Sequence, residues 1–362
     1  MIWIVHLFHI WNCLPNFHVT ENFSCDLMHD CFEGILRYDM AFIIDGLLNK
    51  KYFDIDLLNN RIKFFKFSRA DAGNPMPQIK LEHLRRKHIT MSASEMLCFT
   101  VYFGLLVGDL VPETEPIWSF YILILQIVDI LLERQFSETL VEYLEVLIRE
   151  HHDMYIDLFQ ENLKPKYHLL LHYPIVIRNL GPPRFYWCMR YEAFHRQLKQ
   201  TANSVTCRKN LLVTLSLKQQ LKLSGRLSDK RGFQTKVDFG PRYVIPEKIV
   251  TKFKLSKTFF SVSWITINNI LYKKDFALQL CESKFGQIKN IFTNEKTIYF
   301  MLQPLKTVGF CKHVQAFEII FQGGVTNAED LFVTSFDNMT YSKQVHNFHF
   351  TGNGTCFISV IK

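Results

Sequence analysis

The stretch FFSVSWITINNILYKKDFALQL, residues 259–280, decides that this chain is not built from helices alone. β-Branched and aromatic residues lie on both sides of Asn268 and Asn269, a pattern typical of two strands joined by a tight hairpin. Three later segments add strand candidates: GQIKNIFTNEKTIYFMLQPL (286–305), VQAFEIIFQ (314–322) and TCFISVIK (355–362). We therefore predict a small antiparallel β-rich domain over residues 233–362.

The part of the chain upstream of this domain carries helical patterns. In SASEMLCFTVYFGLL (92–106), Ser92 stands three residues before Glu95, which is the capping-box signature of a helix start. FSETLVEYLEVLIRE (136–150) places its apolar residues on one stripe and its glutamates away from it, as in an amphipathic helix. We predict an α+β fold in which residues 1–232 are mainly helical and precede the β-rich domain.

Composition narrows the class of protein. The chain has 362 residues, of which 48% are hydrophobic and 21% charged, as in a globular protein long enough for two domains. Its nine cysteines include no C-x-x-C pair, so we expect a reducing compartment and no disulfide scaffold. The apolar segment 116–135 is interrupted by Gln126 and Asp129, which favours a buried helix over a membrane span. The apolar N-terminal segment lacks the basic region and cleavage site of a signal peptide.

Positive charge is concentrated in one segment. The formal net charge of the chain is +8, and residues 184–231 alone carry eleven lysines and arginines against two acidic residues. This concentration is typical of a face that binds nucleic-acid phosphates, although a solvated helix face gives the same pattern. The residues that we expect to contact DNA are Arg184, Arg190, His195, Arg196, Lys199, Arg208 and Lys209.

Two histidines, His168 and His172, lie four residues apart in PKYHLLLHYP (165–174) and would project from one helical face. Such a pair can chelate one divalent ion, but a stable site needs two more ligands from elsewhere. The alternative is two partly buried histidines that hydrogen bond within the fold. A zinc-protease motif is excluded because Leu169, not glutamate, follows the first histidine.

Asp26 and His29 form a second pair in DLMHDCFEGIL and are candidates for the missing ligands. They are three residues apart and share a face if a helix starts here. The alternative role for Asp26 is that of an N-cap. Its carboxylate would then accept the amide N–H of Met28 or His29, which stabilises a helix by about 1 kcal/mol.

Glu192 is the third candidate, and it lies among basic residues in GPPRFYWCMRYEAFHRQLK (181–199). A carboxylate in this position can bind Mg²⁺ where arginines and lysines hold a phosphate backbone. Alternatively, Glu192 pairs with its basic neighbours and has no further role.

These three segments, in this order, resemble the C-terminal part of the CACTA (En/Spm-like) cut-and-paste DNA transposases. SVSWITINNILYKKD (261–275) is similar to the small β domain that follows the catalytic region in animal members. The resemblance covers about residues 17–320. It implies a catalytic domain of the RNase H-like recombinase superfamily, in which two aspartates and one glutamate bind the metal ions for DNA cleavage and strand transfer. A helical insertion precedes the glutamate in that family.

The resemblance also implies roles for the candidate residues. By motif, Glu192 matches the terminal catalytic glutamate. His168 and His172 match a histidine pair that joins two cysteines on a structural zinc in related recombinases, and Asp26 and His29 match a D-x-M-H motif. The resemblance thus implies Mg²⁺ in an intact family member, Zn²⁺ as a second ion, DNA as the partner and a nuclear location.

One departure from the family pattern limits the expected activity. In the family, both catalytic aspartates and a C-x-x-C pair precede the D-x-M-H motif. Here only 25 residues precede Asp26, and none of them is aspartate. One glutamate cannot hold two metal ions about 4 Å apart. We therefore expect a truncated, transposase-like DNA-binding protein without strand-transfer activity by itself: the helical insertion, the last helix of the RNase H-like fold and the β domain.

Two other functions remain open from the sequence. The chain could be a domesticated, non-catalytic protein-interaction module. It could also be an unrelated metalloenzyme that uses Asp26, His29, His168 and His172. For partners we expect DNA, either transposon ends or non-specific duplex, and no membrane; the sequence also leaves room for a homo-oligomer.

Overall fold

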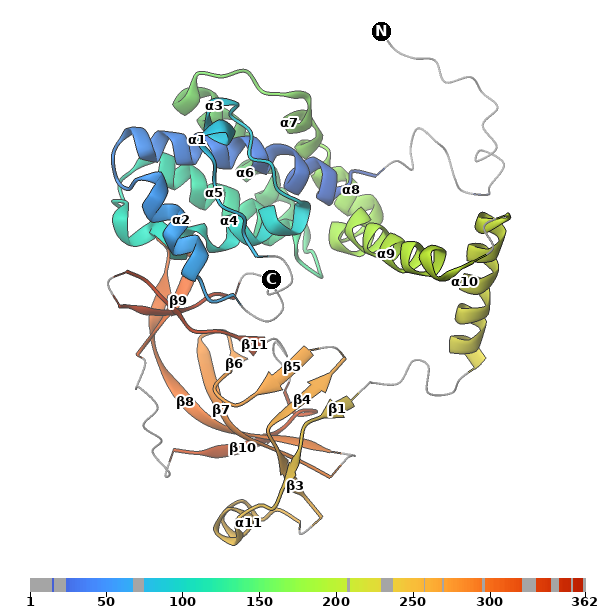
Figure 1. Ribbon diagram of the computed structural model, residues 1–362. Helices are drawn as coiled ribbons and strands as arrows, with labels where there is room; N and C mark the ends of the chain where they lie inside the picture. Colours follow the sequence, from blue (N-terminus) through green and yellow to red (C-terminus); the bar gives the residue numbers. More distant parts are fainter. Residues whose placement is uncertain are drawn as a thin grey trace.

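The computed structural model describes Pro15 and residues 24–67, 75–206, 209–228, 237–256, 258–268, 270–294, 297–320, 330–339, 345–352 and 354–360. Within these residues, a helical region is followed by a region of antiparallel strands (Figure 1). The predicted α+β class and the order of its two parts are confirmed. The predicted boundary at 232–233 falls between 229 and 236, outside the described residues.

Helices account for the regular structure from Met28 to Ser228 in the described part of the chain. The π-helix η2 and the short 3₁₀ helices η3 and η4 interrupt a series of α-helices. The bounds are η2 (Met28–Ile35), α1 (Leu36–Asn49), α2 (Ile55–Phe64), α3 (Leu81–Arg85), α4 (Ala93–Val107), η3 (Gly108–Leu110), α5 (Pro116–Leu131), α6 (Glu138–Phe159), α7 (Pro165–Leu170), α8 (Tyr173–Leu180), η4 (Pro183–Phe185), α9 (Cys188–Ser204) and α10 (Leu211–Ser228).

The two helix patterns read from the sequence are confirmed. The Ser92 hydroxyl accepts the Glu95 amide at the start of α4, and the Glu95 carboxylate accepts the Ser92 amide at 2.8 Å. In α6, Leu144 and Leu147 are buried, whereas Glu142 remains exposed. Local hydrogen bonding and side-chain periodicity decided both elements, so sequence was sufficient.

The core of the helical region is formed mainly by α1, α4, α5 and α6. Trp118 and Tyr121 are almost completely buried on α5. The Tyr121 hydroxyl accepts the Gly104 amide at 2.7 Å and donates to the Thr100 carbonyl at 2.9 Å, which ties α5 to α4. The stretch Ala93–Leu110 is apolar and long enough to span a membrane, but 67% of it is buried within the protein, as in a core helix.

A buried carboxylate connects three helices of this core. Asp39 on α1 is fully buried and accepts the Tyr167 hydroxyl of α7 at 2.6 Å. Its other oxygen lies 2.9 Å from Nε2 of His151 on α6, which is buried as well. A buried carboxylate must be hydrogen bonded, because leaving it without partners costs several kcal/mol. The Asp39 network therefore fixes where α1, α6 and α7 meet.

The C-terminal region is built from antiparallel strands and one helix. The bounds are β1 (Val237–Phe239), β2 (Arg242–Tyr243), α11 (Glu247–Phe253), β3 (Phe260–Val262), β4 (Trp264–Ile267), β5 (Ile270–Lys273), β6 (Ala277–Cys281), β7 (Lys284–Thr293), β8 (Ile298–Cys311), β9 (Ala316–Ile320), β10 (Phe332–Ser335), β11 (Val345–His346), β12 (His349–Phe350) and β13 (Cys356–Ile358). One sheet has the order β1-β4-β5, and the larger sheet follows β11-β6-β7-β8-β9-β13-β12 with β2, β3 and β10 attached at its sides.

The predicted strands and hairpins are confirmed. Strands β4 and β5 pair with Ile267 opposite Ile270, and Asn268 adopts φ 50°, as the first residue of a tight two-residue hairpin requires. Strands β7 and β8 pair with Thr293 opposite Ile298, around the predicted turn at Asn294. Strands β9 and β13 coincide with the two remaining strand candidates.

The β8–β9 hairpin packs into the helical region. The Trp118 indole donates to the His313 carbonyl at 2.8 Å, and His313 Nε2 lies 2.8 Å from the Gly108 carbonyl. Val314 belongs to the core of the helical region, and a Cβ added at Gly108 would lie 2.6 Å from it. On β12, His349 stacks on Phe65 with ring centroids 5.0 Å apart. The two regions thus share a core, which sequence periodicity had not indicated.

The Asp39 network leads to a prediction of stability. Asp39→Ala should lower the free energy of unfolding by roughly 3–5 kcal/mol, because it leaves Tyr167 and His151 without their buried acceptor. The matched control is Asp45→Ala on the same helix, whose ion pair with Lys87 is partly solvated and should contribute less than about 1 kcal/mol. Urea denaturation of both variants measures the difference, and equal losses would contradict the network's role.

Two buried histidines predict how stability depends on pH. Burial lowers the pKa of both His346 and His349 to about 4, so below pH 6.5 the unfolded chain binds protons that the folded chain does not. The two neutral histidines therefore make their full contribution to the free energy of unfolding above pH 6.5, and this contribution is lost as the pH falls toward 4. At pH 5 the loss is about 2 kcal/mol for each histidine.

Thermal unfolding of wild type and His349→Gln at pH 7.5 and pH 5 tests this. The melting temperature of the variant should decrease less from pH 7.5 to pH 5 than that of the wild type. An identical decrease in both proteins would show that protonation of His349 does not control the stability of the fold in this pH range.

Candidate functional site

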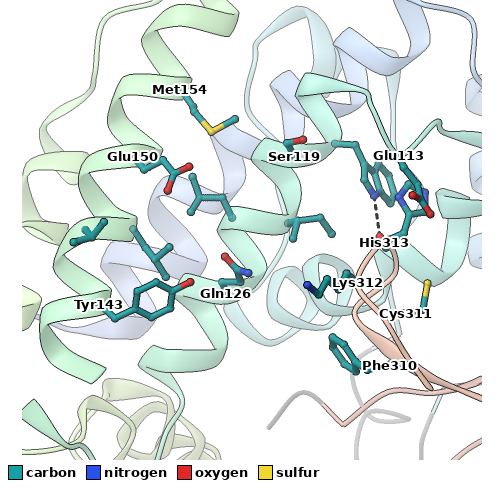
Figure 2. Close-up of a pocket in the computed structure, with 15 residues that line it drawn as sticks. Glu113, Ser119, Gln126, Tyr143, Glu150, Met154, Phe310, Cys311, Lys312 and His313 are labelled. Atoms are coloured by element: carbon teal, nitrogen blue, oxygen red, sulfur yellow. Dashed lines mark hydrogen bonds between the residues drawn. The ribbon is translucent and has the colours of Figure 1, made fainter. Parts of the chain in front are cut away.

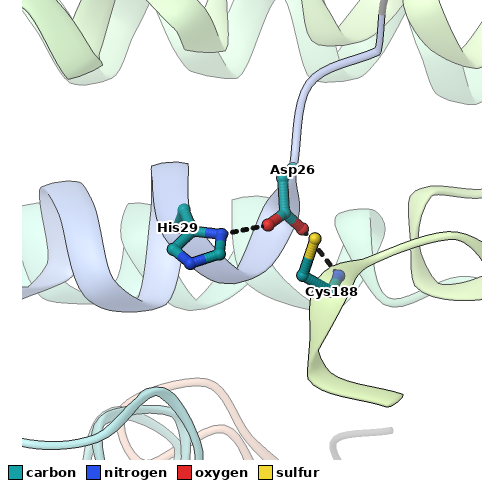
Figure 3. A group of neighbouring side chains, drawn as sticks. All are labelled: Asp26, His29 and Cys188. Carbon is teal, nitrogen blue, oxygen red and sulfur yellow. Dashed lines mark hydrogen bonds and ion pairs between the residues drawn. The ribbon is translucent and has the colours of Figure 1, made fainter. Parts of the chain in front are cut away.

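The first and third motif segments meet in the folded chain. Asp26 lies just before η2, and Cys188 begins α9, 162 positions later; the Cys188 amide donates to Asp26 Oδ1 at 2.9 Å. Four residues along α9, Glu192 Oε1 lies 3.4 Å from Nε2 of His29. Figure 3 shows Asp26, His29 and the Cys188 thiol grouped together. The structure thus brings three predicted site residues, Asp26, His29 and Glu192, into one cluster.

Asp26 makes a hydrogen bond typical of a helix start and also pairs with His29. Its Oδ1 accepts the Met28 amide at 3.3 Å, as expected of a residue at a helix start. Its Oδ2 pairs with Nδ1 of His29. The backbone amide of Asp26 in turn donates to Asp30 Oδ2 at 2.9 Å. Hydrogen bonds within this turn hold the Asp26 carboxylate against the His29 ring.

Helix α7 fixes the position of η2. The Lys166 ammonium donates to the His29 carbonyl at 2.7 Å. At Gly34 the backbone leaves helical geometry, with φ −111° and ψ −107°, and a Cβ there would lie 2.9 Å from both the His29 oxygen and Lys166 Cδ. Glycine is therefore needed for this close approach of α7 to η2.

The hydrogen bonds of the cluster shift its pKa values. Burial raises the pKa of Asp26, but hydrogen bonds from the Cys188 amide, His29 and the Met28 amide outweigh it, so that the net pKa is lowered. The hydrogen bond to Asp26 raises the pKa of His29, against the effect of burial, and the Glu192 charge adds to the increase. A hydrogen bond to Asp26 also raises the pKa of the Cys188 thiol. The cluster therefore favours a charged carboxylate and a positive charge on or near His29.

Helix α9 aligns the cluster with basic side chains. Cys188, Glu192, Arg196 and Lys199 follow each other at spacings of four, four and three residues, which places them on one helical face. Glu192, Arg196 and Lys199 are exposed, and α9 buries none of its residues. Figure 1 shows α9 leading away from the helical body to α10. A phosphate chain placed along this face would meet the cluster at one end and cations at the other.

The remaining predicted DNA contacts differ in exposure. Arg190, His195 and Lys209 are exposed. Arg184 is partly buried and donates to the Leu132 carbonyl at 2.5 Å, so this guanidinium helps to attach η4 to the end of α5. Arg208 lies outside the described residues.

The histidine pair lies apart from the cluster. Nε2 of His168 and Nε2 of His172 are 3.2 Å apart at the end of α7 and in the turn after it. Among the described residues, the group of three ligands that could hold a metal ion comprises Asp26, His29 and Cys188, and it includes neither histidine of the pair. The predicted ligand set Asp26, His29, His168 and His172 therefore does not assemble around one point, and the zinc implied by the resemblance does not find a complete ligand set there.

Magnesium fits the cluster poorly. Two-metal phosphoryl transfer needs several carboxylates, whereas the described cluster offers Glu192 and an Asp26 carboxylate already engaged by His29 and Cys188. The other donors are an imidazole and a thiol, which Mg²⁺ does not favour. We derive no catalytic step from this site.

A large pocket lies elsewhere in the protein. About 670 Å³ in volume, it is lined by α5, α6 and the β8–β9 turn, with Tyr143, Glu150 and Lys312 at its sides (Figure 2). It contains none of the predicted site residues. His313 at its edge lies against the Gly108 carbonyl. The group of possible metal ligands found among the described residues lies outside this pocket.

Cys188 is the site residue that sequence reasoning missed. It lies four residues before Glu192, and this spacing alone would have placed both side chains on one helical face. Comparison with known proteins adds nothing to the assignment, because no protein-family model, no curated protein and no solved structure matches the chain.

The space around two glycines predicts opposite effects for their substitution by alanine. Gly34→Ala should lower the free energy of unfolding by about 1–3 kcal/mol, because the new methyl group overlaps a backbone oxygen and Lys166. Gly225→Ala on α10 meets nothing within 4 Å and should stabilise that helix by about 0.5–1 kcal/mol. Urea denaturation measures the change in the free energy of unfolding for Gly34→Ala, and circular dichroism measures the change in helix content for Gly225→Ala. An unchanged free energy of unfolding in Gly34→Ala would contradict the close approach of α7 to η2.

Proposed function

We propose that this chain is a truncated, transposase-like DNA-binding protein, derived from a cut-and-paste transposon and without strand-transfer activity by itself. The observation that carries the proposal is the α9 face, where Glu192 beside the Asp26–His29 turn is followed by exposed Arg196 and Lys199. The resemblance of the three motif segments to CACTA transposases agrees with it. In this proposal the helical region corresponds to the helical insertion and last helix of an RNase H-like domain, and the protein acts in the nucleus.

The charge of α9 and α10 supports a phosphate-binding role. On α10, Lys218, Lys222 and Arg226 recur every four residues, and this helix contains no acidic residue. Like α9, α10 buries none of its residues. Exposed cations on projecting helices attract DNA mainly by releasing condensed counterions, so binding is insensitive to sequence and weakens with salt. Non-specific affinities in the range of about 10⁻⁴–10⁻⁶ M at physiological salt are expected.

A protein-interaction module is the second candidate, and one observation favours it. Helix α10 exposes six large apolar side chains that are 51–82% accessible: Leu212, Val213, Leu217, Leu221, Leu223 and Leu227. Because all the charges on α10 are positive, the complementary partner is an acidic amphipathic helix. This function would require the leucines of α10, whereas DNA binding requires the cations of α9.

The α9 face predicts a charge-specific loss of DNA binding. The double variant Arg196→Ala, Lys199→Ala should weaken binding to a non-specific duplex about tenfold at 50 mM salt, and should reduce the slope of log affinity against log salt by about 2. The matched control, Lys248→Ala with Lys284→Ala, removes the same charge from exposed positions in the β region. Fluorescence anisotropy over a salt series measures both.

Two results would contradict the proposal in different ways. Equal weakening in the control, or no binding at low salt, would remove the α9 face as a DNA site and favour the interaction module. Magnesium-dependent nicking that is lost in Glu192→Ala would show that the chain cleaves DNA, which would overturn the claim of inactivity.

A further inference from the structure

The donor atoms beside α9 are of three chemical kinds. The cluster contains one thiol, one imidazole and two carboxylates, supplied by two segments far apart in the sequence. Thiol and imidazole ligands together with carboxylate are typical of zinc and are unlike the all-oxygen sets of Mg²⁺ or Ca²⁺. We propose that Asp26, His29, Cys188 and Glu192 form a Zn²⁺ site that fastens the start of η2 to the start of α9. This inference goes beyond DNA binding and does not depend on it.

The contacts of His29 require a positive species between it and Glu192. Nδ1 of His29 pairs with the Asp26 carboxylate, which makes Nδ1 the protonated nitrogen. Nε2 then presents a lone pair toward Glu192 Oε1, only 3.4 Å away. Two electron-rich atoms at this distance repel each other unless a cation lies between them. That cation is either a second proton on the imidazole or a metal ion.

The distance between His29 and Glu192 fits two ligands of a single zinc ion. Ligand atoms around a tetrahedral zinc are about 3.3–3.8 Å apart, given metal–ligand bonds of about 2.0–2.3 Å. The distance of 3.4 Å between His29 and Glu192 lies in this range. One ligand atom each of Asp26, His29 and Cys188 lies within 4.8 Å of the others, and Glu192 adjoins this group through its contact with His29.

Asp26 also offers the outer-shell contact that zinc-bound histidines require. A zinc-ligating imidazole donates its other N–H to a carboxylate or carbonyl, which fixes the ring and makes it a better ligand. The Asp26–His29 pair has this arrangement, with Nε2 left for the metal. Asp26 can therefore orient His29 through Oδ2, and to bind the ion as well it would exchange one of the amide hydrogen bonds that Oδ1 accepts from Met28 and Cys188.

A metal at this position would strengthen the attachment of the start of α9. Helix α9 has no fully buried residue. Its start is held by the hydrogen bond from the Cys188 amide to Asp26, by the edge contact of Trp187 with Phe32 and by the packing of Cys188 and Met189 against the core. The side chains of His29 and Glu192 are 46% and 50% exposed, so an ion can enter from solvent. Zinc would cross-link η2 and α9 and hold the basic face at a fixed position on the helical body.

Cobalt substitution of the purified full chain tests the site. Co²⁺ should bind at one equivalent per chain with a thiolate charge-transfer band in the near ultraviolet, and Zn²⁺ should displace it. Cys188→Ser should abolish the band, and His29→Ala or Glu192→Gln should weaken binding at least tenfold. Cys281→Ser, in the β region, and the double variant His168→Ala, His172→Ala should leave one equivalent and the band intact.

The outcomes separate zinc from the alternatives. Absence of bound metal in the wild type would overturn the proposal and assign the cation to a protonated His29. A band that persists in Cys188→Ser but disappears in the double histidine variant would move the metal to the His168–His172 pair. For any variant with altered circular dichroism, the rise in melting temperature caused by zinc replaces the band as the readout, since binding only to the folded state stabilises it.

DNA affinity is measured separately on chelated and zinc-loaded protein. Zinc binding without DNA binding would refute the proposed function alone, and DNA binding without zinc would refute this inference alone.

Discussion

The fully buried carboxylate of Asp39 is the constraint on which the position of the candidate site depends. It cannot be solvated, so Tyr167 and His151 must reach it, and this brings α7 and α6 against α1. Helix α7 then lies where Lys166 meets the His29 carbonyl and where Gly34 leaves room for it. The Asp26–His29 turn is thus placed by an interaction in the core, one that contains none of the predicted site residues.

The two helices that carry the basic residues, α9 and α10, are positioned without fully buried side chains. Neither α9 nor α10 contributes a fully buried side chain, and only the first turn of α9, through Cys188 and Met189, packs against the core of the helical region. Their cations remain accessible for that reason, and the first turn of α9 is held by polar contacts to Asp26 and His29. The proposed metal site would fix the start of this helix, and its solvated, basic continuation would stay available to phosphates.

Much of the local structure followed from short-range patterns. The capping box at Ser92 and Glu95, the amphipathic stripe of α6 and the hairpin at Asn268 depend on residues within one or two turns of each other, so sequence was sufficient. The union of the two regions was not predictable in this way. The stacking of His349 on Phe65 joins residues almost 300 positions apart, and no periodicity encodes such a contact.

For the candidate site as well, the sequence predicted the residue types, whereas their grouping depended on the tertiary structure. The sequence by itself determined the α+β order, the basic segment, and the identity of Asp26, His29 and Glu192 as residues of interest. Only the tertiary structure decided which candidates meet: Cys188 joins the cluster, whereas His168 and His172 contact each other and lie outside it. The physical reason is that ligand grouping depends on helix packing. That packing is fixed by buried polar and apolar contacts such as those of Asp39, which leave no signature in the spacing of the ligands themselves.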